Sequence, residues 1–383
     1  MPKVTVDGRT VEAAAGQTVL EAARALGITI PALCSHEDLS PVGACRLCLV
    51  EVEGLPGRQF AACKLPVLGG LSVRTETPAL AASRRLVLEL LLTRYADAGQ
   101  DASDRDETEF LRWVRHYGAR PPAGPPAARY PADSDPSPFL RVDLNKCILC
   151  TRCVRACAEV QGRSVWHLGG HGADTRIVAG LGGTMLEAGC ESCGACAAYC
   201  PTGALDDKMS VGLGKPDKVV PTTCGYCGVG CGLDLNVKAG RVIRVTPNPA
   251  APVNGMRLCV KGRYGYDFVH HPDRLKRPRV RRYLLDGAAK PAAGGPGWEW
   301  VEVGWDTALG VTAARLAAVR RESGADALGV FSSAKCTNEE NYLAQKFARQ
   351  VLGTHNVDHC ARLCHSPTVA GLTMALGSGA MSN

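Results

Sequence analysis

The chain has 383 residues, of which 46% are hydrophobic and 21% charged, and its formal net charge is +7. These proportions are typical of a globular protein with two or three domains. Apolar runs are too short to cross a bilayer and the first residues lack the apolar core of a secretory signal, so we expect a cytoplasmic protein without a membrane span. The basic stretch 274–282 is interpreted as a solvated face or an anion contact, and no nucleic-acid partner is predicted.

Cysteine is the most informative residue type. The chain has 19 cysteines, an odd number that excludes complete disulfide pairing within one chain. In a reducing compartment, clustered thiolates are typical metal ligands, and an iron–sulfur cluster needs four of them. Sixteen of the cysteines form four successive groups of four: Cys34, Cys45, Cys48 and Cys63; Cys147, Cys150, Cys153 and Cys157; Cys190, Cys193, Cys196 and Cys200; Cys224, Cys227, Cys231 and Cys259.

The second and third groups both have the spacing C-x2-C-x2-C-x3-C, which is typical of bacterial two-cluster ferredoxins. The fourth cysteine of each run ligates the other cluster in such proteins. Two zinc sites are disfavoured, because zinc ribbons use paired C-x2-C knuckles. A long, glycine-rich insertion separates the two runs. The pattern predicts one 4Fe–4S cluster on Cys147, Cys150, Cys153 and Cys200, and a second on Cys190, Cys193, Cys196 and Cys157.

The first group has a longer initial gap than the plant-type 2Fe–2S spacing. Residues 1–30 nevertheless predict two strands and a helix near 18–26, the start of a β-grasp ferredoxin. This stretch resembles the 2Fe–2S domain of the large iron–sulfur subunit of respiratory complex I and of NAD-linked hydrogenases. The resemblance implies a 2Fe–2S cluster, with a zinc site as the alternative.

The fourth group lies in CGYCGVGC and a later CVKGR. These motifs resemble the 4Fe–4S domain of molybdopterin-guanine-dinucleotide oxidoreductases. In that family, the lysine after the fourth cysteine lies between cluster and pterin, which implies this role for Lys261. The alternative is a solvated lysine. The resemblance adds a third 4Fe–4S cluster.

The last hundred residues predict an α/β fold. A helix is expected over 305–322 and a strand over 327–333, followed by a helix that starts with a capping box of Thr337 and Glu340. A short strand over 356–358 comes next.

Ser366 and Pro367 fit the N-cap and N1 positions of a last helix. Cys364 and His365 would then precede the helix N-terminus, where the dipole lowers a thiol pKa. A buried structural cysteine is the alternative at Cys364.

Residues 332–372 resemble molybdenum- or tungsten-containing formate dehydrogenases, in the stretch SSAKCTNEENYLAQKFARQVLGTHNVDHCARLCHSPTVAGL. The resemblance implies that Cys364 binds the metal of a bis-molybdopterin guanine dinucleotide and that His365 is its catalytic neighbour. It also places Asn338 near the pterin and assigns Lys261 to the catalytic machinery. The other two cysteines, Cys336 and Cys360, are interpreted as structural. Molybdenum and tungsten both stay open.

Two departures from these families are visible. Residues 80–117 contain no cysteine and a single histidine, His116, so the His-plus-three-Cys cluster of complex I is expected to be absent. Members of the formate dehydrogenase family also have several hundred further residues. We therefore expect either a fragment or a partner that supplies the rest of the pterin site.

The predicted fold class is multidomain, α+β and then α/β. The function predicted is formate oxidation, with electrons passed through the clusters to a flavin- and NAD-binding iron–sulfur subunit of the diaphorase type. The alternatives are a non-catalytic, complex I-like electron-transfer subunit and a related enzyme for another substrate, such as nitrate. The predicted segments are a 2Fe–2S domain (1–78), a helical connector (79–120), a Pro/Ala-rich linker (121–137), a two-cluster ferredoxin domain (138–209), a 4Fe–4S domain (217–275) and the beginning of the molybdopterin α/β domain (276–383).

Overall fold

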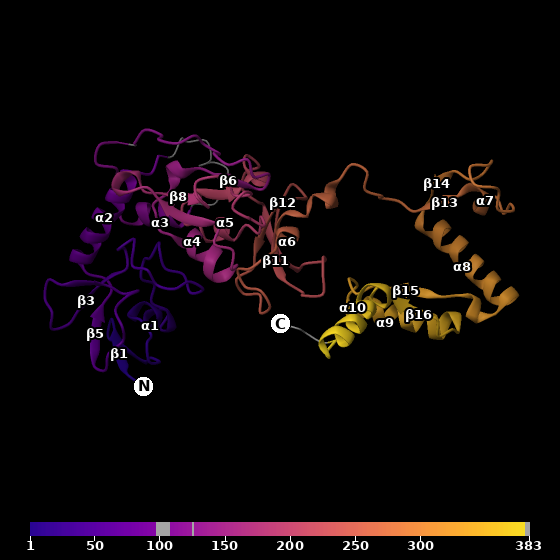
Figure 1. Cartoon of the computed structure of the whole chain (residues 1–383), viewed down its shortest axis with the longest axis horizontal. Helices are drawn as coiled ribbons and strands as arrows, with labels where there is room; N and C mark the ends of the chain where they lie inside the picture. Colours follow the sequence, from indigo (N-terminus) through magenta and orange to yellow (C-terminus); the bar gives the residue numbers. More distant parts are fainter. Residues whose placement is uncertain (97–107, 125, 380–383) are drawn as a thin grey trace. The chain divides into compact units, whose positions relative to one another are not determined.

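The computed structural model describes residues 1–96, 108–124 and 126–379 (Figure 1). The chain forms two compact units, Met1–Cys224 with Cys231–Asp267, and Gly225–Gly230 with Phe268–Asn383. Mixed helices and strands in several small sheets agree with the predicted fold class. Among the described residues, no helix has both the length and the apolar character needed to cross a membrane.

The first domain is a five-stranded sheet of order β2-β1-β5-β3-β4, in which β1 and β5 are parallel and the other pairs antiparallel. A capping box of Thr18 and Glu21 starts helix α1, whose apolar face covers the sheet. The predicted strand–strand–helix start is therefore confirmed. The elements are β1 (Lys3–Val6), β2 (Arg9–Glu12), α1 (Val19–Ala25), β3 (Leu49–Val52), β4 (Gln59–Ala61) and β5 (Leu71–Arg74).

Two helices, α2 (Pro78–Leu92) and α3 (Glu109–His116), connect this sheet to the next domain. Arg84 on α2 is fully buried and donates to the carbonyls of Leu49 and Thr75, at 2.7 Å each. His116 is exposed and makes an edge-on ring contact with Tyr117.

The ferredoxin-like domain is closed by antiparallel pairing of β6 with β9. The glycine-rich insertion between the cysteine runs folds into the hairpin β7–β8. The Pro/Ala-rich linker lies against this domain, because the Asn145 amide bonds the backbone of Arg129 and Tyr130. The elements are β6 (Leu140–Val142), η1 (Leu144–Lys146), α4 (Arg152–Arg155), η2 (Ala156–Val160), β7 (Trp166–Gly169), η3 (Gly172–Asp174), β8 (Arg176–Ala179), α5 (Ala195–Tyr199), β9 (Leu205–Asp207) and η4 (Lys208–Ser210).

A small domain follows, with three antiparallel strands in the order β10-β11-β12. Its apolar core includes Leu233, Val245 and Leu258. The elements are β10 (Lys218–Thr223), β11 (Gly232–Lys238), β12 (Arg241–Pro247), α6 (Val260–Tyr264) and η5 (Asp267–His270).

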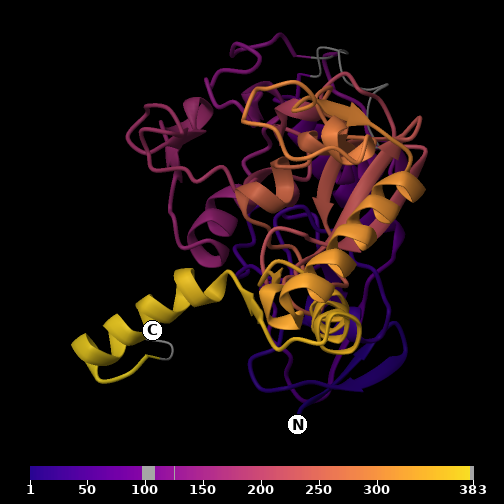
Figure 2. The ribbon, with the colours of Figure 1, turned by 90° about the vertical axis from the view of Figure 1, so that its right-hand side faces the viewer.

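The second unit contains a β-α-β arrangement in which β15 and β16 are parallel. The predicted capping box of Thr337 and Glu340 is confirmed at the start of α9, and Gly353 ends the following turn with a φ of 79°. Figure 2 shows α10 (yellow) extending away from this two-stranded sheet. The elements are β13 (Arg279–Arg281), α7 (Arg282–Leu285), β14 (Trp300–Glu302), α8 (Trp305–Ser323), η6 (Ala325–Ala327), β15 (Val330–Ser332), α9 (Asn338–Lys346), η7 (Phe347–Leu352), β16 (Val357–His359) and α10 (Ala361–Leu376).

The predicted start of the last helix is wrong. Helix α10 begins at Ala361, so Pro367 lies inside it. A proline there costs about 3 kcal/mol, since it removes one helical hydrogen bond. Local contacts favour the earlier start: His359 Nδ1 accepts the N–H of Ala361 at 3.1 Å, and Arg362 Nε lies 2.9 Å from Asp358 Oδ2. Consequently Cys364 lies within the helix and not ahead of it.

Candidate functional site

The four cysteines of the first group are buried together, each at most 7% exposed. Cys34 is hydrogen-bonded to Cys45 and Cys63, and Cys48 to Cys63. These bonds lower the pKa of Cys34 and of Cys48 and raise the pKa of Cys45 and of Cys63. Four soft donors in a dry pocket fit an iron–sulfur cluster.

The eight ferredoxin-type cysteines separate into two sets that exchange one member. Cys147, Cys150, Cys153 and Cys200 line one largely enclosed cavity. Burial, the largest effect, raises the pKa of Cys147 to about 11 and that of Cys150 to about 12, and nearby Cys200 adds to both shifts. The geometry therefore groups three cysteines of one run with the last of the other.

The second set likewise combines three cysteines of one run with the last cysteine of the other run. Burial raises the pKa of Cys190, Cys193 and Cys196, and Cys157 from the earlier run contributes to each shift. Cys157 Sγ accepts the N–H of Val165 at 3.2 Å.

Both cysteine runs use the same left-handed backbone turns. In the first run Leu149 and Thr151 have φ values of 56° and 60°, and in the second Ser192 and Gly194 have 54° and 73°. Non-glycine residues in this region are strained by about 1–3 kcal/mol, and such strain is concentrated at functional sites. The repetition indicates a duplicated binding loop.

The fourth group is partly assembled within the first unit. The N–H of Cys224 donates to the carbonyl of Cys231 at 2.8 Å. A Cβ on Gly262 would lie 3.6 Å from Cys224 Sγ and 4.0 Å from Cys259 Sγ, so helix α6 passes directly beside both sulfurs. Cys227 lies on the 225–230 loop, which belongs to the second unit. Lys261 is exposed in the first turn of α6.

The predicted pterin-site residues lie on two helices of the second unit. Cys364 and His365 are exposed on α10, and Asn338 is exposed at the start of α9. The N–H of Cys364 bonds the carbonyl of Cys360 at 3.0 Å, so it is used within the helix.

Cys360, interpreted from sequence as structural, lies at the carboxyl end of the parallel strand pair. Its Sγ accepts the N–H of Ala334 at 3.3 Å, and this bond is the main cause of its lowered pKa. No sequence motif pointed to this contact, because the strand pair that creates it joins residues far apart in the chain.

Sequence reasoning also missed a set of buried arginines. Arg263 lies on α6 and forms a bidentate ion pair with Asp207, with Nε–Oδ1 at 3.0 Å and Nη2–Oδ2 at 2.9 Å. Tyr264 donates to the same carboxylate at 2.7 Å. Arg152 and Arg155 lie among the cysteines of the second group, where the pattern TRCVRAC was a visible but unused signal.

In the described ranges, no three His, Cys, Asp or Glu side chains are arranged to bind a single metal ion.

Family comparisons match almost the whole chain. Residues 2–78 match the 2Fe-2S iron-sulfur cluster binding domain, and residues 137–206 the ferredoxin-like domain of NADH-quinone oxidoreductase subunit 3. Residues 217–271 match the Molybdopterin oxidoreductase Fe4S4 domain, and residues 274–383 the Molybdopterin oxidoreductase family.

Relatives of this chain have several names. It is 36% identical to the NADPH-Fe(3+) oxidoreductase subunit alpha of Geobacter sulfurreducens (strain DL-1 / KN400), over 98% of this chain and 42% of the relative. It is also 36% identical to an NADH-quinone oxidoreductase subunit of Rhizobium meliloti (strain 1021), over 94% of this chain and 40% of the relative. A Staphylococcus aureus (strain USA300) protein named as a candidate formate dehydrogenase is 29% identical, over 98% and 40%.

The chain therefore spans about two fifths of the length of these curated relatives. A solved chain of an NAD+-reducing [NiFe]-hydrogenase in the H2-reduced state is 31% identical. That likeness has a TM-score of 0.48 and covers 55% of this chain and 89% of that one.

Proposed function

From the premise that this chain is a molybdopterin oxidoreductase-type iron–sulfur protein, we propose that it is the electron-transfer and proximal pterin-binding part of a formate dehydrogenase. The observation that carries the electron-transfer role is the reciprocal grouping of eight cysteines, four of them buried and four half-buried, into two sets. The assignment to formate rests on Cys364 and His365 in the Cys-His-x-Pro pattern.

In this proposal each cysteine group holds one cluster. The clusters exchange single electrons, and the pterin-bound metal supplies the two-electron chemistry of formate. The protein contributes burial, which excludes water from the thiolates, and backbone N–H groups that favour their charge. The 2Fe–2S ligands are Cys34, Cys45, Cys48 and Cys63; the 4Fe–4S ligands are Cys147, Cys150, Cys153 and Cys200, then Cys190, Cys193, Cys196 and Cys157, then Cys224, Cys227, Cys231 and Cys259.

The pterin-side roles are proposed residue by residue. Cys364 would be the ligand of molybdenum or tungsten, His365 would orient or accept a proton beside it, and Lys261 and Asn338 would contact the pterin. The N–H of Cys364 is used within α10, so no free helix N-terminus points at this residue.

A flavin- and NAD-binding subunit of the diaphorase type is the proposed electron acceptor. No dinucleotide-binding fingerprint is present in the 383 residues. The name of the Rhizobium meliloti relative, an NADH-quinone oxidoreductase subunit, supports a nicotinamide-linked assembly.

A second candidate is a complex I-like electron conduit without pterin chemistry. It is favoured by the higher identity to the Geobacter and Rhizobium proteins, 36%, than to the formate dehydrogenase-named protein, 29%.

Metal analysis of the complete native complex, purified anaerobically, tests both candidates. One 2Fe–2S and three 4Fe–4S clusters require about 14 iron atoms per chain. Iron at that level, with about one molybdenum or tungsten and formate-dependent dye reduction, would support the first candidate. The same iron without either metal would support the conduit. Turnover of nitrate but not formate would overturn the substrate assignment.

A further inference from the structure

One helix connects the first two cysteine groups of the chain. Its two segments, α4 and η2, contain Cys153 and Cys157, which are four residues apart and therefore share one face. Arg152, Arg155 and Glu159 recur at spacings of three and four on another face. This second face contacts residues 32–40, the loop of the β-grasp domain that contains Cys34.

Arg155 contacts a candidate ligand of each domain at its backbone. Its Nη2 donates to the carbonyl of Cys34 at 2.5 Å and to the carbonyl of Cys150 at 3.3 Å, and its Nη1 donates to Ser40 at 2.5 Å. Arg155 is only 9% exposed, so these bonds are shielded from water. A single guanidinium thus joins the peptide groups of two cysteines that are 116 residues apart in sequence.

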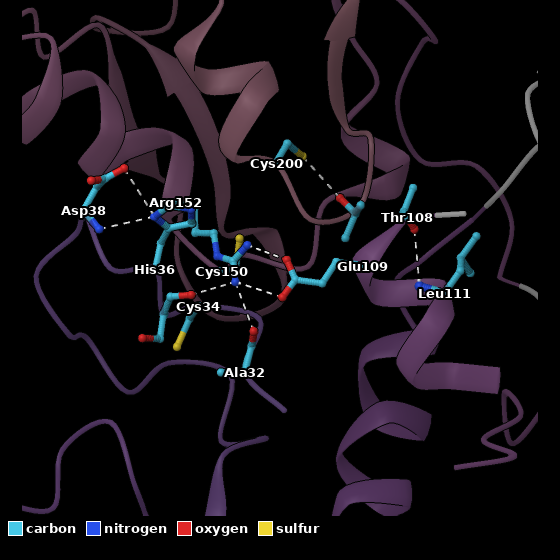
Figure 3. A network of polar contacts seen from close by, with 12 residues as sticks. Ala32, Cys34, His36, Asp38, Thr108, Glu109, Leu111, Cys150, Arg152 and Cys200 are labelled. Atoms are coloured by element: carbon cyan, nitrogen blue, oxygen red, sulfur yellow. Dashed lines mark hydrogen bonds and ion pairs between the residues drawn. The ribbon is translucent and has the colours of Figure 1, made fainter. Parts of the chain in front are cut away.

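Neighbouring side chains hold the same loop (Figure 3). Arg152 Nη2 donates to the carbonyls of Ala32 at 3.0 Å and Ser35 at 2.7 Å, on either side of Cys34. Its guanidinium also pairs with Glu109 on α3, at 2.6 Å from Nη1 to Oε2. Glu159 accepts both the N–H and the hydroxyl of Ser40, at 2.8 and 2.6 Å.

Apolar packing points to the same adjacency. Cys34 and Cys45 of the first group and Cys150 of the second belong to one buried cluster, together with Ile148 and Leu33. Cys157 and Cys196 of the reciprocal set lie in a different cluster, which also contains Cys153, so the link to Cys34 runs through Cys150.

We propose that Arg155 is the positioning residue for electron exchange between the 2Fe–2S centre and the 4Fe–4S centre held by Cys147, Cys150, Cys153 and Cys200. The proposal rests on the proposed iron–sulfur function but not on formate. Arg155 makes no covalent bond and carries no electron. One electron leaves the reduced centre and enters the oxidised one, and the bridge from Cys34 to Cys150 fixes their separation.

Two properties of the guanidinium contribute separately. Its permanent positive charge stabilises the reduced form of both centres, because charge and hydrogen bonding around the sulfurs set the potential. Its planar fork reaches three carbonyls at once, those of Cys34 and Cys150 from Nη2 and that of Ser40 from Nη1, which an ammonium cannot do with the same geometry.

The test uses the full-length protein with its clusters, in the absence of formate. Redox titration followed by EPR gives the potential of each centre, and flash photoreduction followed by the 2Fe–2S signal gives the internal transfer rate. In Arg155→Gln we expect electron transfer between the two centres to be at least tenfold slower. We also expect the 2Fe–2S centre to bind its electron about tenfold more weakly, which lowers its midpoint potential by about 59 mV.

Arg155→Lys separates the two contributions. We expect the lysine variant to keep the potentials close to wild type while transfer stays slow. The matched control is Arg129→Gln in the same domain, whose guanidinium is 44% exposed and pairs with Asp174, and it should change neither quantity. Normal transfer and potential in an iron-complete Arg155→Gln would overturn the proposal.

A second measurement decides the matter if Arg155→Gln fails to assemble. Magnetic interaction between the reduced 2Fe–2S centre and its nearest neighbour is compared in Cys150→Ser and Cys193→Ser. Loss of the splitting in Cys150→Ser alone supports the proposed adjacency. Loss only in Cys193→Ser overturns it, whereas the absence of all clusters from the wild type overturns the proposed function itself.

Discussion

Removing the carboxylate of Asp207 should be among the most damaging single substitutions in the first unit. Asp207 ends β9 of the ferredoxin-like domain, and its partners Arg263 and Tyr264 lie on α6 of the next domain. Both members of the ion pair are buried, with side-chain exposures of 4% for Arg263 and 6% for Asp207. Asp207→Ala would leave a buried guanidinium without its two carboxylate bonds and a buried phenol without its acceptor.

The expected loss is about 3–5 kcal/mol, the usual cost of removing one partner of a buried pair. The lost hydrogen bond from Tyr264 adds about 1 kcal/mol. The matched control is Asp174→Ala, whose carboxylate is 79% exposed beside Arg129 and should cost at most about 1 kcal/mol.

Urea unfolding of the cluster-containing protein, followed by circular dichroism and visible absorption, measures both variants. A double variant that replaces Asp207 and Arg263 by leucine and methionine should recover much of the stability, since no charge is then left buried. Equal losses in Asp207→Ala and Asp174→Ala would refute the reasoning.

Four further outcomes are expected. Gly194→Ala should disrupt the same junction, because a Cβ there would overlap Arg263 Cδ and the backbone is left-handed. Cluster EPR and urea unfolding would detect the disruption, and a wild-type EPR spectrum would contradict this expectation. Cys364→Ala should abolish formate oxidation with unchanged iron, and surviving activity would exclude the metal-ligand role. Cys227→Ala should lower iron by about four atoms and block electron exit, so normal formate:NAD turnover would exclude the path. Cys360 should be alkylated faster than Cys336 at neutral pH, since the lowered pKa of Cys360 increases its thiolate fraction. Mass spectrometry of iodoacetamide-treated protein measures the two alkylation rates, and equal rates would contradict the expectation.

Local signals in the sequence predicted the elements that they specify directly. The capping box of Thr337 and Glu340 predicted one helix start, because it satisfies backbone donors through residues three positions apart. The helix expected near 18–26 also starts with such a box, which the structure shows at Thr18 and Glu21. The reciprocal cysteine sets followed from spacing alone. Prediction failed at α10, where Ser366-Pro367 resembled a helix start but contacts of Asp358 and His359 favour one that lies earlier.

Contacts between distant segments had no such signal. Nothing in the neighbourhood of Arg155 indicates that its partners are the carbonyls of Cys34 and Ser40, since backbone acceptors leave no trace in residue type. The docking of the linker through Asn145 was invisible for the same reason. Sequence thus predicted how the cysteines are grouped, but not which groups are neighbours.

Both junctions between domains in the first unit depend on buried arginines, Arg152 and Arg155 at one and Arg263 at the other. Apolar packing alone would stabilise such junctions at least as well, because desolvation offsets much of the gain from a buried charge. Directional bonds differ in that they are satisfied at one relative position only, whereas apolar surfaces tolerate sliding. The proposed electron exchange between fixed centres depends on constant separations, so we infer that the arginines serve register and charge. Replacing Arg155 by methionine should slow internal electron transfer at least tenfold. It should also cost about 1–3 kcal/mol of folding stability for each carbonyl of Cys34, Ser40 and Cys150 that stays buried without a donor. A folded methionine variant with the wild-type transfer rate would refute this inference.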